Sequence, residues 1–154
     1  MMEIDKQLEI LINDANKYGV PSIVIERAIA PVLKIFSDRL QFQEYYILQN
    51  LEDEWVLNVI NNPQSRQEKT VIYAFSTVKD AANFQGKSNP SLLAAPILVT
   101  HLLFRLFSLQ QVDSIIFLDT PGNLNQGIEI TRDRLSTLIK QQIQQLSNTP
   151  PNIA

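Results

Sequence analysis

The sequence predicts an α+β fold, in which helices pack on a mostly antiparallel sheet and two helices lead the chain. Three observations predict it. Apolar residues recur every three or four positions through about the first forty residues, which is the period of an amphipathic helix. The pattern then changes to the alternation that is typical of strands. Further along, single strand-like runs alternate with helical ones.

Two N-terminal helices are expected. The first carries an apolar stripe and ends at Gly19, which is placed as the left-handed residue that commonly caps a helix. The second runs from Ser22 to about Leu40 and contains Pro31. Because proline lacks a backbone N–H and crowds the preceding turn, we expect either a kink at Pro31 or a new helix that begins there.

A β-hairpin is predicted in the middle of the chain. Two runs rich in aromatic and β-branched residues, Tyr45 to Gln49 and Trp55 to Ile60, flank the acidic turn Glu52-Asp53-Glu54. A polar loop from Asn61 to Glu68 follows. Lys69 to Ser76 then reads KTVIYAFS and predicts a third strand beside the hairpin, because consecutive strands usually neighbour each other.

The second half predicts helices that alternate with single strands. Thr77 and Asp80 have the spacing of a capping box at the start of a short helix. Pro96 restricts a strand within Leu92 to Leu98 to the edge of the sheet. The remaining expected elements are an apolar helix over Thr100 to Leu109, a buried strand over Ser114 to Leu118, a turn-rich loop over Pro121 to Gly127, a short strand over Ile128 to Ile130, and a final helix capped by Thr131.

Length and composition predict one domain over residues 1–147 with a flexible tail over 148–154. There is no cysteine, which excludes disulfides, thiolate zinc sites and a cysteine nucleophile. No apolar run reaches the roughly 20 residues of a membrane span, and the start of the chain lacks the pattern of a secretory signal. We therefore expect a cytoplasmic protein that binds no membrane. The net charge of −3, without a lysine or arginine cluster, argues against nucleic-acid binding.

Four residues form the candidate ligand site. His101 is the only histidine, and Arg105 follows it by four positions, so the two share a helix face. Asp119 and Thr120 follow the strand over Ser114 to Leu118. If the two pairs lie close together, they form a small site for an anion or a polar ligand. In the alternative interpretation, His101 and Arg105 mark the solvated edge of the helix, or Arg105 pairs structurally with an acid.

No catalytic residue, metal site or cofactor is predicted. Asp119-Thr120-Pro121-Gly122 resembles the switch segment of GTPases, but the chain has no G-x-x-x-x-G-K-[ST] phosphate loop, so a tight turn is the simpler interpretation. The acidic turn at residues 52–54 lacks the ligand alternation of a calcium loop. The strand aromatics are better explained by core and cross-strand packing than by RNA recognition.

From Trp55 to Leu146 the pattern resembles the SseB N-terminal domain family. The resembling segments read WVLNVI, TVIYAFSTVKDAANF, DSIIFLDTPG and TRDRLSTLI. Residues at the family's turn and aromatic positions are Phe75, Ser76, Phe84, Asp119, Pro121 and Gly122. The family's usual asparagine before the proline is replaced by Asp119-Thr120, and the first forty residues have no counterpart. The resemblance implies a binding or regulatory module without established catalytic residues.

Two functions are therefore weighed. The first is a non-catalytic interaction or regulatory module that takes a protein partner or forms a homodimer, and it is motivated by abundant apolar surface without a nucleophile elbow, phosphate loop or metal cluster. The second is a small-molecule-binding protein or small enzyme that uses His101, Arg105, Asp119 and Thr120. The placement of those four side chains discriminates between the two.

Overall fold

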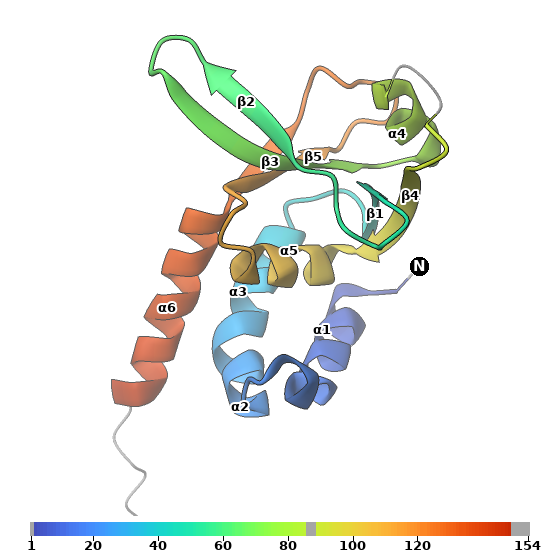
Figure 1. Ribbon diagram of the computed structural model, residues 1–154. Helices are drawn as coiled ribbons and strands as arrows, with labels where there is room; N and C mark the ends of the chain where they lie inside the picture. The colour runs from blue at the N-terminus through green and yellow to red at the C-terminus, as the bar shows by residue number, and fades with distance from the viewer. Residues whose placement is uncertain (1, 86–88, 149–154) are drawn as a thin grey trace, which may run out of the picture.

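A sheet with helices on both faces forms the body of the molecule. The computed structural model describes residues 2–85 and 89–148. Most helices lie against one face of the sheet, whereas α4 lies on the opposite side (Figure 1). The α+β class predicted from the sequence is confirmed. The end of the expected tail, residues 149–154, lies outside the described residues.

The N-terminal region is helical, but it is more divided than the two helices predicted. Gly19 adopts the left-handed conformation with φ 68°, as expected. The second helical stretch stays continuous through a π-helical turn that directly precedes Pro31, and α3 begins with Pro31 in its first turn. A π turn shifts the hydrogen-bond ladder, which accommodates the missing proline N–H without a break. The segments are α1 (Ile4–Asn13), η1 (Ala15–Tyr18), α2 (Ser22–Val24), η2 (Ile25–Ile29) and α3 (Ala30–Ser37).

The sheet has the strand order β4-β1-β3-β5-β6, with β2 paired to β3. The β3–β5 pair is parallel, and the other pairs are antiparallel. The prediction of a mostly antiparallel sheet is therefore confirmed. The strands are β1 (Glu44–Gln49), β2 (Asn58–Asn62), β3 (Gln67–Phe75), β4 (Leu93–Leu98), β5 (Ser114–Leu118) and β6 (Ile128–Thr131).

The predicted hairpin between the first two strand-like runs forms only next to its turn. β1 lies between β3 and β4, and a single bridge joins Gln49 to Trp55. The side-chain oxygen of Asn50 accepts the N–H groups of Glu52 and Glu54, and this turn brings the chain back antiparallel to the end of β1, where the N–H of Val56 donates to the oxygen of Leu48. Beyond Val56 the second run leaves β1 and forms a longer hairpin between β2 and β3, which extends into the stretch predicted as a loop. The outer part of this arm is exposed and contacts no core, so its residues can be polar. Backbone pairing between β2 and β3 holds it together.

The second half follows the prediction closely. Pro96 lies in β4, at the edge of the sheet. α5 (Val99–Ser108) and α6 (Arg132–Asn148) occupy their expected positions, and Thr131 Oγ1 accepts the N–H of Arg134 as a cap. The capping box of α4 (Val78–Gln85) is half formed, because Thr77 Oγ1 accepts the N–H of Asp80. The Asp80 carboxylate instead accepts the N–H of Gly122.

Two apolar clusters fill the interior. The larger lies between the sheet and the helices α1, α3, α5 and α6, and the smaller joins α4 to the opposite face of the sheet. Within residues 2–85 and 89–148, no helix combines the length and the hydropathy that a membrane span requires.

Candidate functional site

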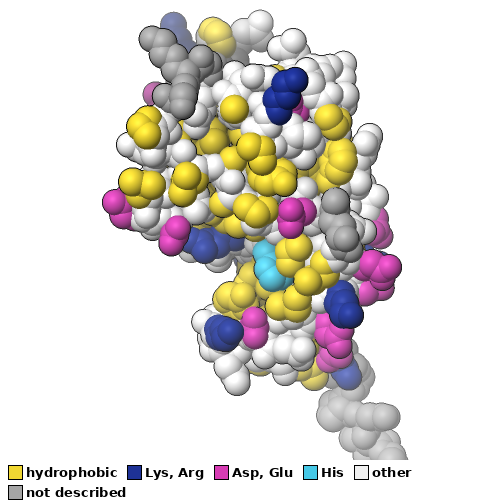
Figure 2. Space-filling view, turned by 90° about the vertical axis from the view of Figure 1, so that its right-hand side faces the viewer, with side chains coloured by type: hydrophobic (Ala, Val, Ile, Leu, Met, Phe, Trp, Pro, Cys, Tyr) yellow, Lys and Arg dark blue, Asp and Glu magenta, His cyan; other side chains and the backbone are white. Residues whose placement is uncertain are grey.

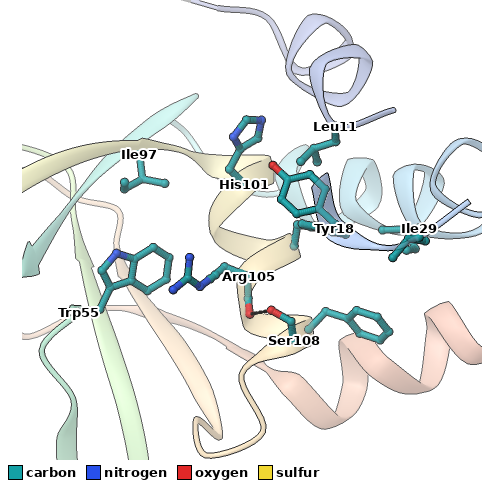
Figure 3. Close-up of a pocket in the computed structure, with 11 residues that line it drawn as sticks. Leu11, Tyr18, Ile29, Trp55, Ile97, His101, Arg105 and Ser108 are labelled. Carbon is teal, nitrogen blue, oxygen red and sulfur yellow. Dashed lines mark hydrogen bonds between the residues drawn. The ribbon is translucent and has the colours of Figure 1, made fainter. Parts of the chain in front are cut away.

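A pocket of about 550 Å³ runs along the solvent side of α5. Figure 3 shows His101, Arg105 and Ser108 on successive turns of that helix. Trp55 and Ile97 lie on one side of them, and Leu11, Tyr18 and Ile29 lie on the other. The remaining lining residues are Val20, Phe104 and Phe107.

The amphipathic pattern of α5 explains why these polar residues face the pocket. Leu102, Leu103 and Leu106 are completely buried against the core. Positions three and four apart lie on one helix face, so His101 and Arg105 must leave the core together. The predicted shared face of these two residues is confirmed.

Arg105 lies across the face of Trp55. The guanidinium carbon is 5.2 Å from the centroid of the indole ring, within the range of a cation–π interaction. Arg105 is exposed, and among the described residues it forms no ion pair. The structural alternative of an Arg105–acid pair is therefore not formed, and the guanidinium N–H donors can reach a ligand.

An acidic hollow adjoins the pocket on the other side of the Trp55–Arg105 contact. It measures about 330 Å³ and shares these two residues with Glu52, Asp53 and Glu54. The bridge from Gln49 to Trp55 fixes the end of the acidic turn beside α5. Arg105 thus separates a mainly apolar pocket from a negatively charged surface.

His101 lies one helical turn before Arg105. Its Nε2 is 3.4 Å from the backbone oxygen of Gln7 in α1. Burial lowers the pKa of His101 below its ordinary value, against the smaller opposing effect of the Gln7 contact. The ring is therefore neutral at pH 7, and Arg105 is the permanently charged side chain among the residues that line the pocket.

Tyr18 and Phe104 form an aromatic wall. Their ring centroids are 4.9 Å apart in an edge-to-face arrangement, and Tyr18 remains 43% exposed. Gly19 turns the chain directly after Tyr18, which holds the phenol ring against α5. Sequence reasoning did not assign Tyr18 to the site. The sequence feature that could have indicated Tyr18 is its position immediately before Gly19, the expected left-handed cap.

Asp119 and Thr120 lie elsewhere, so the four predicted residues do not form one site. These two border a separate hollow of about 470 Å³ together with Gln41. The Asp119 carboxylate is buried and accepts hydrogen bonds from the Tyr45 hydroxyl and from the backbone N–H of Gln41. Burial raises the pKa of Tyr45 above its ordinary value, and the hydrogen bond to Asp119 is the second cause of this rise. Asp119 is therefore a structural acceptor that ties the end of β5 to the segment before β1.

The turn after Asp119 has the structure of a tight turn. Gly122 has φ 82°, and the N–H of Asn123 donates to the oxygen of Thr120 at 3.0 Å. The N–H of Gly122 donates to the Asp80 carboxylate at 3.0 Å, which joins this turn to α4. The acid and glycine of the GTPase-like segment thus serve internal contacts.

The last polar residue of the pocket wall on α5 is Ser108. Ser108 Oγ donates to the backbone oxygen of Arg105 at 2.9 Å, so this serine bonds to its own helix and not to His101. Across the part of the chain that the structure describes, no three histidine, aspartate or glutamate side chains gather as metal ligands.

Comparisons with known proteins add no assignment. A scan against protein-family models finds no family that matches the chain. A search of curated proteins finds no matching relative. The resemblance to the SseB N-terminal domain family therefore stays a prediction from the sequence pattern.

Proposed function

We propose that this chain is a non-catalytic binding module whose ligand occupies the pocket along α5. The observation that carries the proposal is the composition of this pocket. Aromatic and aliphatic side chains dominate its walls, and a few polar groups, His101, Arg105 and Ser108, lie on one helix face. Pockets of about 300 to 1,000 Å³ with this composition are typical of small-molecule sites. The expected ligand has an aromatic or branched apolar body.

Binding of an uncharged aromatic probe tests the proposal. N-phenyl-1-naphthylamine should bind saturably, with increased probe fluorescence and a change in the emission of Trp55. Trp55 is the only tryptophan, so its emission reports on the pocket directly. Tyr18→Ala should weaken the probe by about fivefold, because it removes one aromatic wall.

Ile35→Ala is the matched control. Ile35 is 49% exposed on α3 and does not line the pocket, so its truncation should leave the probe affinity unchanged. A probe signal that rises linearly without saturation, or that Tyr18→Ala and Ile35→Ala reduce equally, would contradict the proposed pocket.

Self-association is the second candidate, and a separate surface favours it. The face of the sheet that carries α4 is covered less completely than the opposite face. Val78 and Phe84 of α4 are 53% and 37% exposed there. Figure 2 shows hydrophobic side chains gathered over the upper half of this side of the molecule. A two-fold axis would place the same apolar surface of two copies against each other.

Sedimentation velocity tests this candidate. We expect the sedimentation coefficient to rise with concentration toward that of a dimer, and Val78→Lys to abolish the rise. Ile35→Lys, on α3, should have no effect. A monomer at every concentration would exclude the homodimer and leave the pocket proposal intact.

A further inference from the structure

We propose that the pocket along α5 selects ligands that carry one carboxylate on their apolar body, and that Arg105 binds this group. The proposal rests on the proposed function, because it names the ligand class of the same pocket.

The first argument is the state of the Arg105 guanidinium. Its cation–π contact with Trp55 holds the guanidinium over the indole ring but uses none of its N–H donors. No ion pair of the described residues occupies those donors either. A planar fork of donors matches a carboxylate, with which it can form two parallel hydrogen bonds. Arg105 therefore keeps these donors available for a carboxylate.

The second argument is the balance of charge around the pocket. Arg105 is the one permanent cation among the lining residues, and burial keeps His101 neutral at pH 7. On the far side of Arg105, the acidic turn at residues 52–54 contributes negative charge. The acidic turn repels any anion, but Arg105 offsets this repulsion for one anionic group, whereas the second charge of a dianion would meet the same repulsion without a partner.

The third argument is the position of His101. A rise of about 1.5 Å per residue places it about 6 Å along the helix axis from Arg105, on the same face. A neutral imidazole can hydrogen-bond to a polar group of the ligand body but adds no second site for an anion. The carboxylate is therefore expected at the Trp55 end of the pocket, and the apolar body is expected to extend past His101 toward the Tyr18 wall.

Paired naphthalene ligands test this selectivity. By isothermal titration calorimetry at pH 7, 2-naphthoate should bind about tenfold more tightly than the isosteric, uncharged 2-naphthamide, the difference expected of one charge-assisted contact. 2-Naphthyl phosphate at pH 8, where it is a dianion, should bind more weakly than 2-naphthoate. Arg105→Gln should reduce the affinity for 2-naphthoate to that for 2-naphthamide and leave the 2-naphthamide affinity nearly unchanged.

Arg39→Gln is the matched control. Arg39 also lies over an aromatic ring, with its guanidinium carbon 5.5 Å from the centroid of Phe36, but it does not line the pocket. Its replacement should preserve the tenfold preference. Unfolding curves of both variants show whether the fold is retained.

The outcomes separate this inference from the proposed function. If N-phenyl-1-naphthylamine binds but 2-naphthoate and 2-naphthamide have equal affinities, the carboxylate selectivity is overturned and the pocket proposal stands. Tighter binding of 2-naphthyl phosphate, or a preference that survives Arg105→Gln, would also overturn it. If neither the naphthalene ligands nor N-phenyl-1-naphthylamine binds, the pocket proposal itself fails.

Discussion

Asp119→Ala should lower the free energy of unfolding by about 3 to 5 kcal/mol. The buried carboxylate accepts one hydrogen bond from the Tyr45 hydroxyl and one from the backbone N–H of Gln41. Alanine leaves both donors without this acceptor, and Tyr45 is completely buried. Urea unfolding followed by circular dichroism measures the change. Probe binding in the pocket along α5 should persist in the folded variant, because Asp119 lies in a different hollow.

Two further variants isolate this contact. Asp38 is an exposed carboxylate at the end of α3, so Asp38→Ala should change the free energy of unfolding by less than about 0.5 kcal/mol. Tyr45→Phe should cost less than Asp119→Ala, and the double variant should be less destabilised than the sum of the two because they share one hydrogen bond. Additive effects would show that Tyr45 and Asp119 do not act as a pair.

Gln7→Leu should lower the free energy of unfolding by about 2 to 4 kcal/mol, although it adds apolar surface to a buried position. The Gln7 amide is completely buried. Its nitrogen donates to the backbone oxygens of Met2 and Gln43, and its oxygen accepts from the N–H and the hydroxyl of Thr100. Leucine has a similar volume but leaves these partners unsatisfied. Thermal and urea unfolding give the magnitude.

Gln141→Leu is the control for this substitution. Gln141 is an exposed residue of α6, so the same chemical change there should alter stability by less than about 0.5 kcal/mol. An equal effect of the two variants would mean that the network around Gln7 contributes nothing beyond the general effect of replacing a helical glutamine.

The helices and the buried strands could be predicted from the sequence because their apolar residues carry the period of the element. The hairpin could not, for a physical reason. Pairing between strands is made by the backbone, and the apolar pattern of Tyr45 to Gln49 is the same whether its neighbour is β2 or β4. The turn held by the side chain of Asn50 returns the chain to β1, but the pairing there ends at Val56 and β2 pairs with β3. The polar outer part of the β2–β3 arm carries no apolar signal at all.

The candidate site was predictable only in part. The spacing of His101 and Arg105 along one helix placed them together correctly. The distance of His101 and Arg105 from Asp119 and Thr120 depends on the order of the strands in the sheet. Residue spacing in the sequence does not reveal that order. Trp55 enters the site through the bridge to Gln49, and Tyr18 enters through the turn at Gly19. Both are tertiary effects, so the sequence showed two of the polar groups but not the pocket around them.

The parallel pairing of β3 with β5 has a consequence for how the chain acquires its structure. Ser114 in β5 pairs with Val71 in β3, and α4, β4 and α5 all lie between them in the sequence. Closing such a long loop is slow compared with forming a hairpin. During synthesis on the ribosome, one side of β3 therefore stays without its partner until residue 118 has emerged. The nascent chain consequently presents an open strand edge to chaperones, and to other nascent chains, while residues 76–118 are synthesised.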